Sequence, residues 1–109
     1  MSSYLIQVSY TVESVASLIK NPRNRTETVR KSVKKLGGKL VGIWLSFGDS
    51  DVVVIVDMPD NASAAALALA VGGSGTAKSV KTTPLLSIDE GMVALKKAGN
   101  SGYKPVGSK

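Results

Sequence analysis

Two aspartates in one short segment come closest to a chemical motif in this 109-residue chain. Asp49 and Asp51 stand two apart between two strand-like runs, and paired carboxylates could bind a hard cation or act as an acid and a base. Aspartate is also common in tight turns, because its side chain accepts hydrogen bonds from nearby backbone N–H groups. We interpret the pair as turn residues and keep Asp51 as a candidate catalytic or ligand-binding residue.

The sequence contains no cysteine and no histidine, which narrows the chemistry open to the protein. Cys and His metal sites, thiol catalysis, a Ser-His-acid triad and a histidine pH switch are excluded. Carboxylates, Lys, Arg, Tyr and Ser remain as reactive groups. We predict no metal site and no cofactor.

Two tyrosines lie at the ends of a run that alternates as a strand does. Tyr4, Ile6, Val8 and Tyr10 share one face of this run. The tyrosine hydroxyls could hydrogen-bond a small ligand, although ordinary half-buried strand tyrosines explain them equally well. Tyr10 joins Asp51 as a candidate for catalysis, and the candidate ligand-binding residues are Tyr4, Tyr10 and Asp51.

The positive charge of the chain is concentrated in one segment. The net charge is +6, and residues 20–39 hold eight of the fourteen basic residues but only one acidic residue, Glu27. Clustered Lys and Arg can bind phosphate backbones or another anionic partner, whereas a solvated helix face is the commoner explanation. We favour the solvated face and do not expect nucleic acid, since the glycine-aromatic run of ferredoxin-like RNA binders is missing. The candidate basic patch consists of Arg23, Arg25, Arg30, Lys31, Lys34 and Lys35.

A short helix and a longer helix are predicted after the first strand. Thr11 can cap a helical turn over residues 14–20, and Pro22 is placed to open the longer helix from its first turn. A stripe of apolar residues at i, i+4 and i+7 predicts that the longer helix packs on a sheet, and it consists of Val29, Val33 and Leu36. The glycine pair that follows ends this helix.

Two strands over residues 39–47 and 52–58 come next, and a four-residue connection would place Phe47 opposite Val52. This register puts an unbroken apolar surface under the helices, formed by Val41, Ile43, Leu45, Phe47, Val52, Val54, Val56 and Met58. The other face collects Leu40, Gly42, Trp44, Ser46, Val53, Ile55 and Asp57, with alternate residues of the first strand. That second face is mixed, but it is too apolar for ordinary solvent surface.

An alanine-rich helix over residues 62–70 follows, with Asp60 as its expected N-cap. The glycine-rich segment 72–75 ends it and leads to a weaker strand over residues 76–83. Glycine-rich turns that hold phosphate follow a strand and open a helix, and here the order is reversed. We therefore interpret this segment as a flexible turn.

The C-terminal part predicts one more helix and a tail. Ser87 and Glu90 form a capping-box pattern that opens a helix to about Ala98. Glycine, proline, serine and lysine dominate the last ten residues. We predict one domain over residues 1–99 and a mobile tail over residues 100–109.

The element order predicts an α+β, ferredoxin-like fold: a βαββαβ antiparallel sheet with both main helices on one face. Four strands of about six residues leave a bare second face of about 400 Å². This area matches the largest apolar patches that monomers usually tolerate. We therefore expect a homodimer or a higher assembly of dimers, whose interface residues are Trp44, Val53, Ile55 and Leu5.

Several segments resemble the GYD domain family, which falls within the broader group of dimeric α+β barrels. They are the opening strand with Tyr10-Thr11, the Leu36-Gly37-Gly38-Lys39-Leu40 junction, the Gly48-x-x-Asp51 turn before a valine-rich strand, and the Pro59-Asp60 start of the alanine-rich helix. The family signature is glycine, any residue, tyrosine, aspartate, and Ser50 stands here in place of the tyrosine. The resemblance covers residues 4–98 and implies a dimeric α+β barrel assembly but no particular biochemical function.

Three functional hypotheses follow. The first is a homo-oligomeric ferredoxin-like protein that binds a small molecule between the sheet and the helices, where related barrel enzymes keep their pockets. The second is a cofactor-free oxygenase or isomerase of the dimeric barrel type, acting on a small organic substrate through a tyrosine, Asp51 or Trp44. The third is an RNA or anionic-partner binder that uses the basic segment.

The N-terminus lacks the basic and apolar regions of a secretion signal, and no apolar run approaches the roughly 20 residues of a membrane span. We expect a cytoplasmic protein without a membrane partner.

Overall fold

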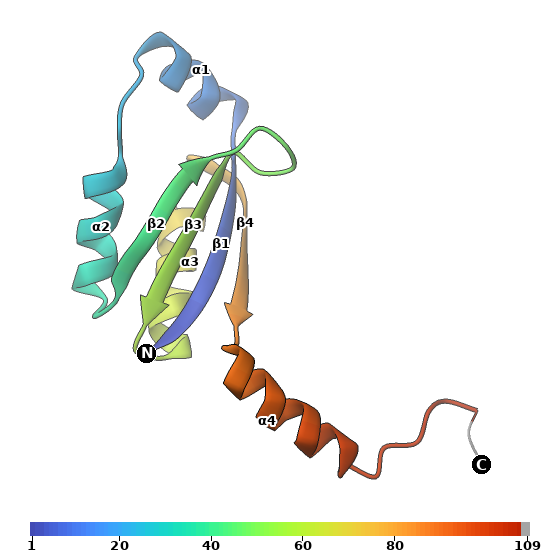
Figure 1. Cartoon of the computed structure of the whole chain (residues 1–109). Coiled ribbons are helices and arrows are strands. Elements are labelled where there is room, and N and C mark those ends of the chain that lie inside the picture. The colour runs from blue at the N-terminus through green and yellow to red at the C-terminus, as the bar shows by residue number, and fades with distance from the viewer. Residues whose placement is uncertain (108–109) are drawn as a thin grey trace.

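The computed structural model describes residues 1–107 and places four strands and four helices in them (Figure 1). In chain order the elements are β1 (Ser2–Tyr10), α1 (Val12–Lys20), α2 (Thr26–Lys35), β2 (Lys39–Leu45), β3 (Val52–Met58), α3 (Asn61–Gly72), β4 (Ala77–Leu85) and α4 (Ile88–Gly99). The predicted βαββαβ pattern is confirmed, with α1 and α4 as additions to it. Within residues 1–107, no helix combines the length and the apolar character that crossing a membrane requires.

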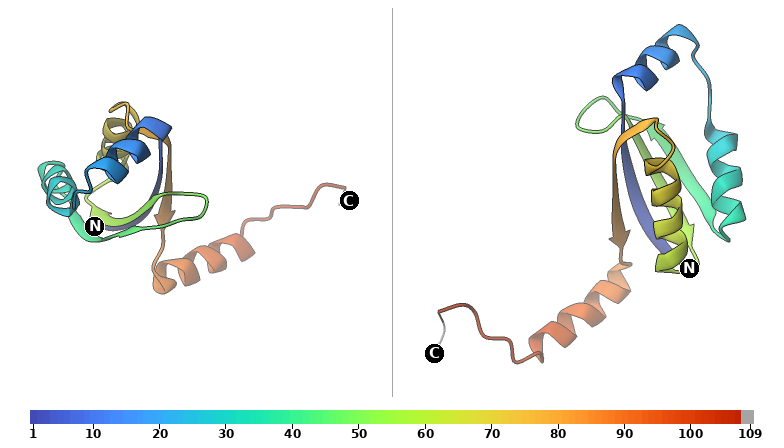
Figure 2. Two further views of the ribbon diagram at one scale, coloured as in Figure 1. Left: turned by 90° about the horizontal axis from the view of Figure 1, so that it is seen from above. Right: turned by 180° about the vertical axis from the view of Figure 1, so that it is seen from behind.

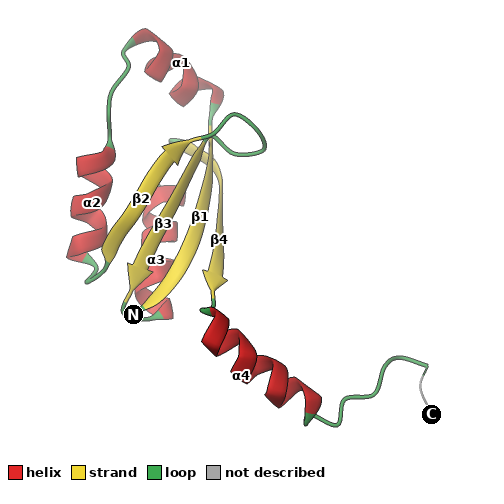
Figure 3. Ribbon diagram, in the orientation of Figure 1, coloured by secondary structure: helices red, strands yellow, loops and turns green. Residues whose placement is uncertain are grey.

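The strands form one antiparallel sheet in the order β2-β3-β1-β4. β1 is central, and its Ile6 lies opposite Val54 of β3 and Thr82 of β4. Figure 2 and Figure 3 show α2 and α3 on one side of this sheet, and none of the helices in residues 1–107 packs on the other side. This arrangement confirms the ferredoxin-like fold class. We call the uncovered side the open face; it carries Leu5, Gln7, Gly42, Trp44, Val53, Ile55 and Thr83.

The hydrophobic core lies between the sheet and the two covering helices. Strand side chains alternate between the faces, so every second residue of the central strands enters this core. From the sheet it receives Tyr4, Ile6, Val8, Leu40, Val52, Val54, Val56 and Met58. Val33 of α2 and the pair Ala64 and Leu67 of α3 are buried against them.

The predicted faces of β2 are wrong at its start. The pairing of β2 with β3 shifts between Leu40 and Gly42, so Leu40 lies opposite Val56 and is buried. Val41, which was expected in the core, is 54% exposed. A bulge inserts one extra residue into a strand, and every side chain before it moves to the other face.

The predicted end of the same strand is also wrong. β2 stops at Leu45, which pairs with Val52, whereas Phe47 was expected in that position. Phe47 lies fully exposed in the loop between the strands. This loop is closed by a 2.9 Å hydrogen bond from the N–H of Ser46 to the carbonyl oxygen of Asp51.

Helix α2 begins four residues later than predicted, at Thr26 and not at Pro22. The N–H of Thr26 donates a 3.0 Å hydrogen bond to Oδ1 of Asn24. Such local side-chain bonds compete with helical hydrogen bonding and keep the preceding residues in a loop. Arg23 and Arg25 lie in this loop between α1 and α2.

The three predicted helix caps are confirmed. Oγ1 of Thr11 accepts a hydrogen bond from the N–H of Ser14, at the start of α1. Oδ1 of Asp60 accepts one of 2.8 Å from the N–H of Ser63, and the bonds with this serine lower the pKa of Asp60. The capping box at Ser87 opens α4.

Helix α4 and residues 100–107 project from the rest of the molecule (Figure 1). The radius of gyration is 17.5 Å, whereas a compact domain of this length has about 13 Å. Residues 100–107 contain neither helix nor strand, and residues 108 and 109 of the expected mobile tail lie outside the described residues. The predicted domain limit at residue 99 coincides with the end of α4 and stays a prediction.

Candidate functional site

Tyr10 and Asp51 meet where β1 ends and β3 begins. Oδ2 of Asp51 accepts a 2.7 Å hydrogen bond from the backbone N–H of Tyr10, and the N–H of Asp51 donates to the carbonyl oxygen of Val8 at 2.8 Å. The pairing of β1 with β4 shifts between Ser9 and Tyr10, and the carboxylate supplies an acceptor at this irregular position. The aspartate of the Gly48-x-x-Asp51 turn therefore joins the two central strands.

Asp49 contributes to the same turn through its backbone. Its carbonyl oxygen accepts a 3.0 Å hydrogen bond from Oγ of Ser9, while its side chain is exposed. Ser50, in the position of the family tyrosine, uses its carbonyl to accept a bond from Oγ of Ser46. Within residues 1–107, no three carboxylates gather into a group that could hold a metal ion. The contacts of both aspartates agree with a role in the turn.

The phenol of Tyr10 is half-buried between charged neighbours. Burial raises the pKa of Tyr10 above its ordinary value of 10.0, the nearby Arg25 guanidinium lowers this pKa, and the Asp51 carboxylate raises it again, with a net upward shift. The phenol is therefore protonated at neutral pH. It can donate a hydrogen bond to a ligand but is poorly suited to act as a base.

Three adjoining cavities surround Tyr10 and Arg25, which line all of them. The outer cavity, of about 340 Å³, lies beside α1. The middle cavity, of about 550 Å³, lies along the end of β2 and includes Trp44 in its wall. The inner cavity, of about 340 Å³, lies between the sheet and the helices α2 and α3. Because they share two residues, we treat the three as one groove.

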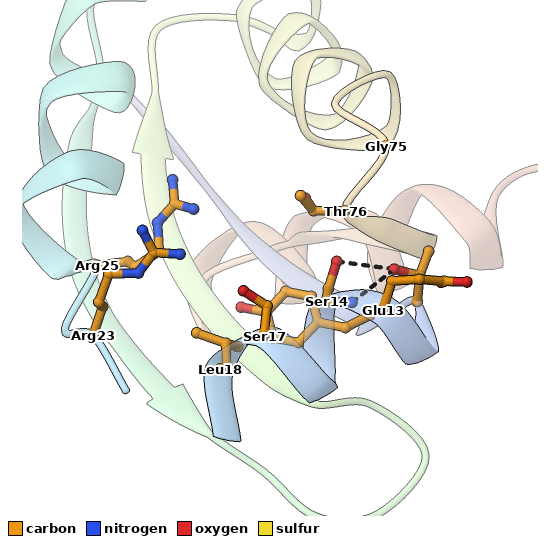
Figure 4. Close-up of a pocket in the computed structure, with 10 residues that line it drawn as sticks. Glu13, Ser14, Ser17, Leu18, Arg23, Arg25, Gly75 and Thr76 are labelled. Atoms are coloured by element: carbon orange, nitrogen blue, oxygen red, sulfur yellow. Dashed lines mark hydrogen bonds between the residues drawn. The ribbon is translucent and has the colours of Figure 1, made fainter. Parts of the chain in front are cut away.

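The groove is charged at its mouth and apolar inside. Figure 4 shows Arg23 and Arg25 on one side of the outer cavity and Ser14 and Ser17 of α1 across from them. The inner cavity is walled mainly by apolar side chains, which are Ile6, Val8, Val29, Ile43, Val52, Val54, Leu67, Ala70 and Val71. A guanidinium pair suits a carboxylate or phosphate, and the interior suits an apolar group.

Tyr4, the third candidate ligand-binding residue, lies away from this groove. It is buried in the core, and its hydroxyl donates a hydrogen bond to Oδ1 of Asn61 in α3. Six residues of extended strand, about 20 Å, separate it from Tyr10. The structure thus brings Tyr10 and Asp51 together and leaves Tyr4 apart.

The basic patch divides into two groups in the structure. All six residues are exposed, but Arg23 and Arg25 line the groove, whereas Arg30, Lys31, Lys34 and Lys35 lie on α2. Nε of Arg30 lies 3.2 Å from Oε1 of Glu27, one turn away on the same helix. The six residues are close in the chain, which is why the sequence groups them. The separate place of Arg25 depends on the loop before α2, whose path no local pattern predicts.

The four predicted interface residues lie on the open face. Leu5 pairs with Ile55, and Trp44 pairs with Val53. The indole ring of Trp44 lies over Gly42, since a methyl group there would be 2.4 Å from Cη2 of the ring. Trp44 is nevertheless 52% exposed, and it also lines the middle cavity. The open face and the groove therefore meet at this residue.

We expect the two charged neighbours of Tyr10 to move its pKa in opposite directions. Arg25→Gln should raise the pKa further, and Asp51→Asn, which keeps an oxygen acceptor for the Tyr10 N–H, should lower it. Ultraviolet absorbance of tyrosinate during an alkaline titration measures this pKa once the signal of Tyr10→Phe is subtracted. Shifts of the same sign in both variants would contradict the geometry described above.

The same shift gives the direction of a stability effect. The folded-state pKa lies above the unfolded value of 10.0, so the contribution of the neutral phenol is fully present below pH 10.0. It is lost as the pH rises through the folded-state pKa.

The topology and the groove define an α+β protein of the ferredoxin-like class. The GYD domain family model matches residues 4–95. The chain therefore belongs to the GYD domain family, as the sequence segments indicated.

Two solved structures support the fold. MtbAldR is 11% identical with a TM-score of 0.51, and the match covers 79% of this chain and 52% of that chain. A transcriptional regulator from Neisseria meningitidis in complex with L-Met is 15% identical with a TM-score of 0.50, covering 79% and 50%. The chain thus spans about half the length of these two proteins. An uncharacterized NIPSNAP domain protein from Burkholderia xenovorans is 13% identical with a TM-score of 0.49, covering 80% and 94%. A search of curated proteins finds no significant match.

Proposed function

We propose that this GYD domain protein is a homodimer that binds a small anionic organic molecule between its sheet and its helices. The observation that carries the proposal is the convergence of all three cavities on Tyr10 and Arg25. One end of the groove carries two guanidinium groups beside the carboxylate of Glu13, and the other end offers an apolar chamber. The proposal assigns binding and no reaction.

The groove has the dimensions and polarity of a small-molecule site. Ligand pockets typically enclose about 300–1,000 Å³ and combine apolar walls with a few placed polar groups. The inner cavity, at about 340 Å³, falls in this range. Arg25 would hold the anionic group through charge-assisted hydrogen bonds, and the protonated phenol of Tyr10 would donate another. The apolar part of the ligand would extend toward Leu67 and Val71.

The homodimer accounts for the open face. Leu5 of β1 pairs with Ile55 of β3, and Trp44 of β2 pairs with Val53 of β3, so the four side chains lie together across three strands. A two-fold contact needs only one self-complementary surface, and Trp is frequent among residues that anchor such contacts. A cytoplasmic location is part of the same proposal.

The ligand proposal is tested with two fluorescent probes of similar shape but different charge. Anilinonaphthalene sulfonate carries an anionic group, whereas N-phenylnaphthylamine is uncharged. We expect Arg25→Gln to weaken sulfonate binding about tenfold, because a hydrogen bond to a charged group contributes about 1.5–3 kcal/mol. Binding of the uncharged probe should stay within about twofold of the unchanged protein.

Lys34→Gln is the matched control, since it removes one positive charge from the exposed surface of α2. Its effect on sulfonate binding should be small. An equal loss in Lys34→Gln and Arg25→Gln would mean that the probe responds to overall charge. An unchanged affinity in Arg25→Gln would contradict an anion site in the groove.

A further inference from the structure

Helix α4 carries an apolar side that stays exposed within residues 1–107. Its apolar residues recur at i, i+4 and i+7 and are Ile88, Met92 and Leu95. These side chains are 83%, 49% and 68% exposed, and the helix has no buried residue. Its charged residues Asp89, Glu90, Lys96 and Lys97 complement the helix dipole at the two ends. The sequence therefore specifies a well-formed helix whose apolar side is left exposed to solvent.

Helix α4 lies on the same side of the sheet as the open face. The helix starts directly after β4, at the edge of the sheet, and only Leu86 and Ser87 connect the two elements. In Figure 2, α4 lies on the opposite side of the sheet from α2 and α3 and runs away from its own strands. It thus extends into the space that a molecule covering the open face would occupy.

The open face alone is too small for a stable dimer interface, so a second contact between the subunits is needed. Two sheet faces of about 400 Å² bury about 800 Å² when they meet, whereas stable interfaces usually bury about 1,200–2,000 Å². A helix of 12 residues is about 18 Å long, and one side of it is about 10 Å wide. Two such arms, each pressed on a partner surface of equal area, add about 700 Å². The combined area reaches the range of a stable dimer.

We propose that α4 is an arm exchanged between subunits, whose apolar side packs on a second copy of this chain. The inference deepens the homodimer of the proposed function and rests on it. Each subunit would extend its arm past the shared interface, so that Met92 and Leu95 become buried only in the dimer.

The first test compares two variants of the full chain by sedimentation equilibrium. Leu95→Asp should weaken the dimer on the order of a hundredfold, because each dimer would lose this anchor twice. Lys97→Asp places the same side chain on the opposite side of α4 and should leave the dimer within about threefold of the unchanged protein. Neither residue is buried in one chain, so both variants should fold.

The second test locates the contact. The chain has no cysteine, so Met92→Cys can be labelled at one position with a photoreactive benzophenone maleimide. In a mixture of isotope-labelled and unlabelled chains, crosslinks should join the two kinds of chain. Crosslinks confined to single chains, an unchanged dimer in Leu95→Asp, or a protein that is monomeric at all concentrations would each overturn the inference.

The groove lies within one chain, so its occupancy separates the two proposals. The Leu95→Asp variant should bind the sulfonate probe with nearly the affinity of the unchanged protein. If the crosslinking and sedimentation tests contradict the arm contact while the protein still binds the sulfonate probe, the ligand proposal stands. If crosslinks join the two kinds of chain but the protein does not bind the probe, only the ligand proposal is contradicted.

Discussion

Trp44→Asp should convert the homodimer into a monomer. The indole is half-exposed in one chain, so the substitution removes no core packing and the fold should survive. In the dimer, each face would lose its aromatic anchor and receive a charge without a partner. A loss of about 2 kcal/mol on each side weakens association on the order of a thousandfold. Light scattering at micromolar concentration measures the change in mass.

Phe47→Asp is the control for this variant. Phe47 is equally apolar and is fully exposed, but it lies in the loop between β2 and β3 and not on the open face. Its replacement should leave the mass unchanged. Dissociation in both variants, or in Phe47→Asp alone, would place the interface elsewhere on the molecule.

Gly38→Ala should destabilise the fold by about 3 kcal/mol, the upper part of the range for overpacked cores. A Cβ at Gly38 would lie 2.3 Å from Sδ of Met58 and 2.6 Å from the carbonyl oxygen of Asp57. The methionine is completely buried, and the carbonyl belongs to the sheet, so neither has free space to move into. Urea denaturation followed by circular dichroism measures the free energy of unfolding.

Gly37→Ala is the matched neighbour of that substitution. Gly37 has a φ of 83°, which costs an alanine about 1–2 kcal/mol, but its nearest new contact would be Cγ of Pro59 at 3.5 Å. We expect this variant to be clearly less destabilised than Gly38→Ala. If Gly37→Ala lowered the free energy of unfolding more than Gly38→Ala, backbone conformation, and not the close contact with β3, would be the reason for glycine at this junction.

The structure explains the two glycines of the family junction differently. The N–H of Gly37 bonds to the carbonyl of Lys34, and the N–H of Gly38 bonds to that of Val33, both at 3.0 Å. This is the Schellman pattern that ends helices, and it could be predicted from the glycine pair alone. The need for a second glycine arises from contact with β3, a strand about twenty residues away, and no local pattern contains that information.

Local patterns predicted most of the fold. Alternation in β1 and β3 and the caps at Thr11, Asp60 and Ser87 all depend on neighbours a few residues away. The bulge near Val41 does not depend on near neighbours in the chain, because the pairing of β2 with β3 determines it. A regular period of two therefore assigned Val41 and Leu40 to the wrong faces.

The candidate site was predictable only in part. Asp51 stood out because of the turn signature, and Tyr10 because it ends a strand. Arg25 appeared only as one of several basic residues, since its place in the groove depends on the loop that Asn24 keeps out of α2. The groove is lined by segments that are far apart in the sequence, so no motif of fixed spacing predicts it.

Fluorescence of Trp44 during dilution tests the central claim most directly, that a second copy of the chain covers the open face. Trp44 is the sole tryptophan, so all indole emission comes from this residue, and in protein free of groove ligand its changes on dilution report on the open face. At high concentration the emission should be blue-shifted and protected from acrylamide quenching. On dilution it should shift to the red and lose that protection as the mass falls to one chain. Emission from a water-exposed indole at every concentration would contradict the claim.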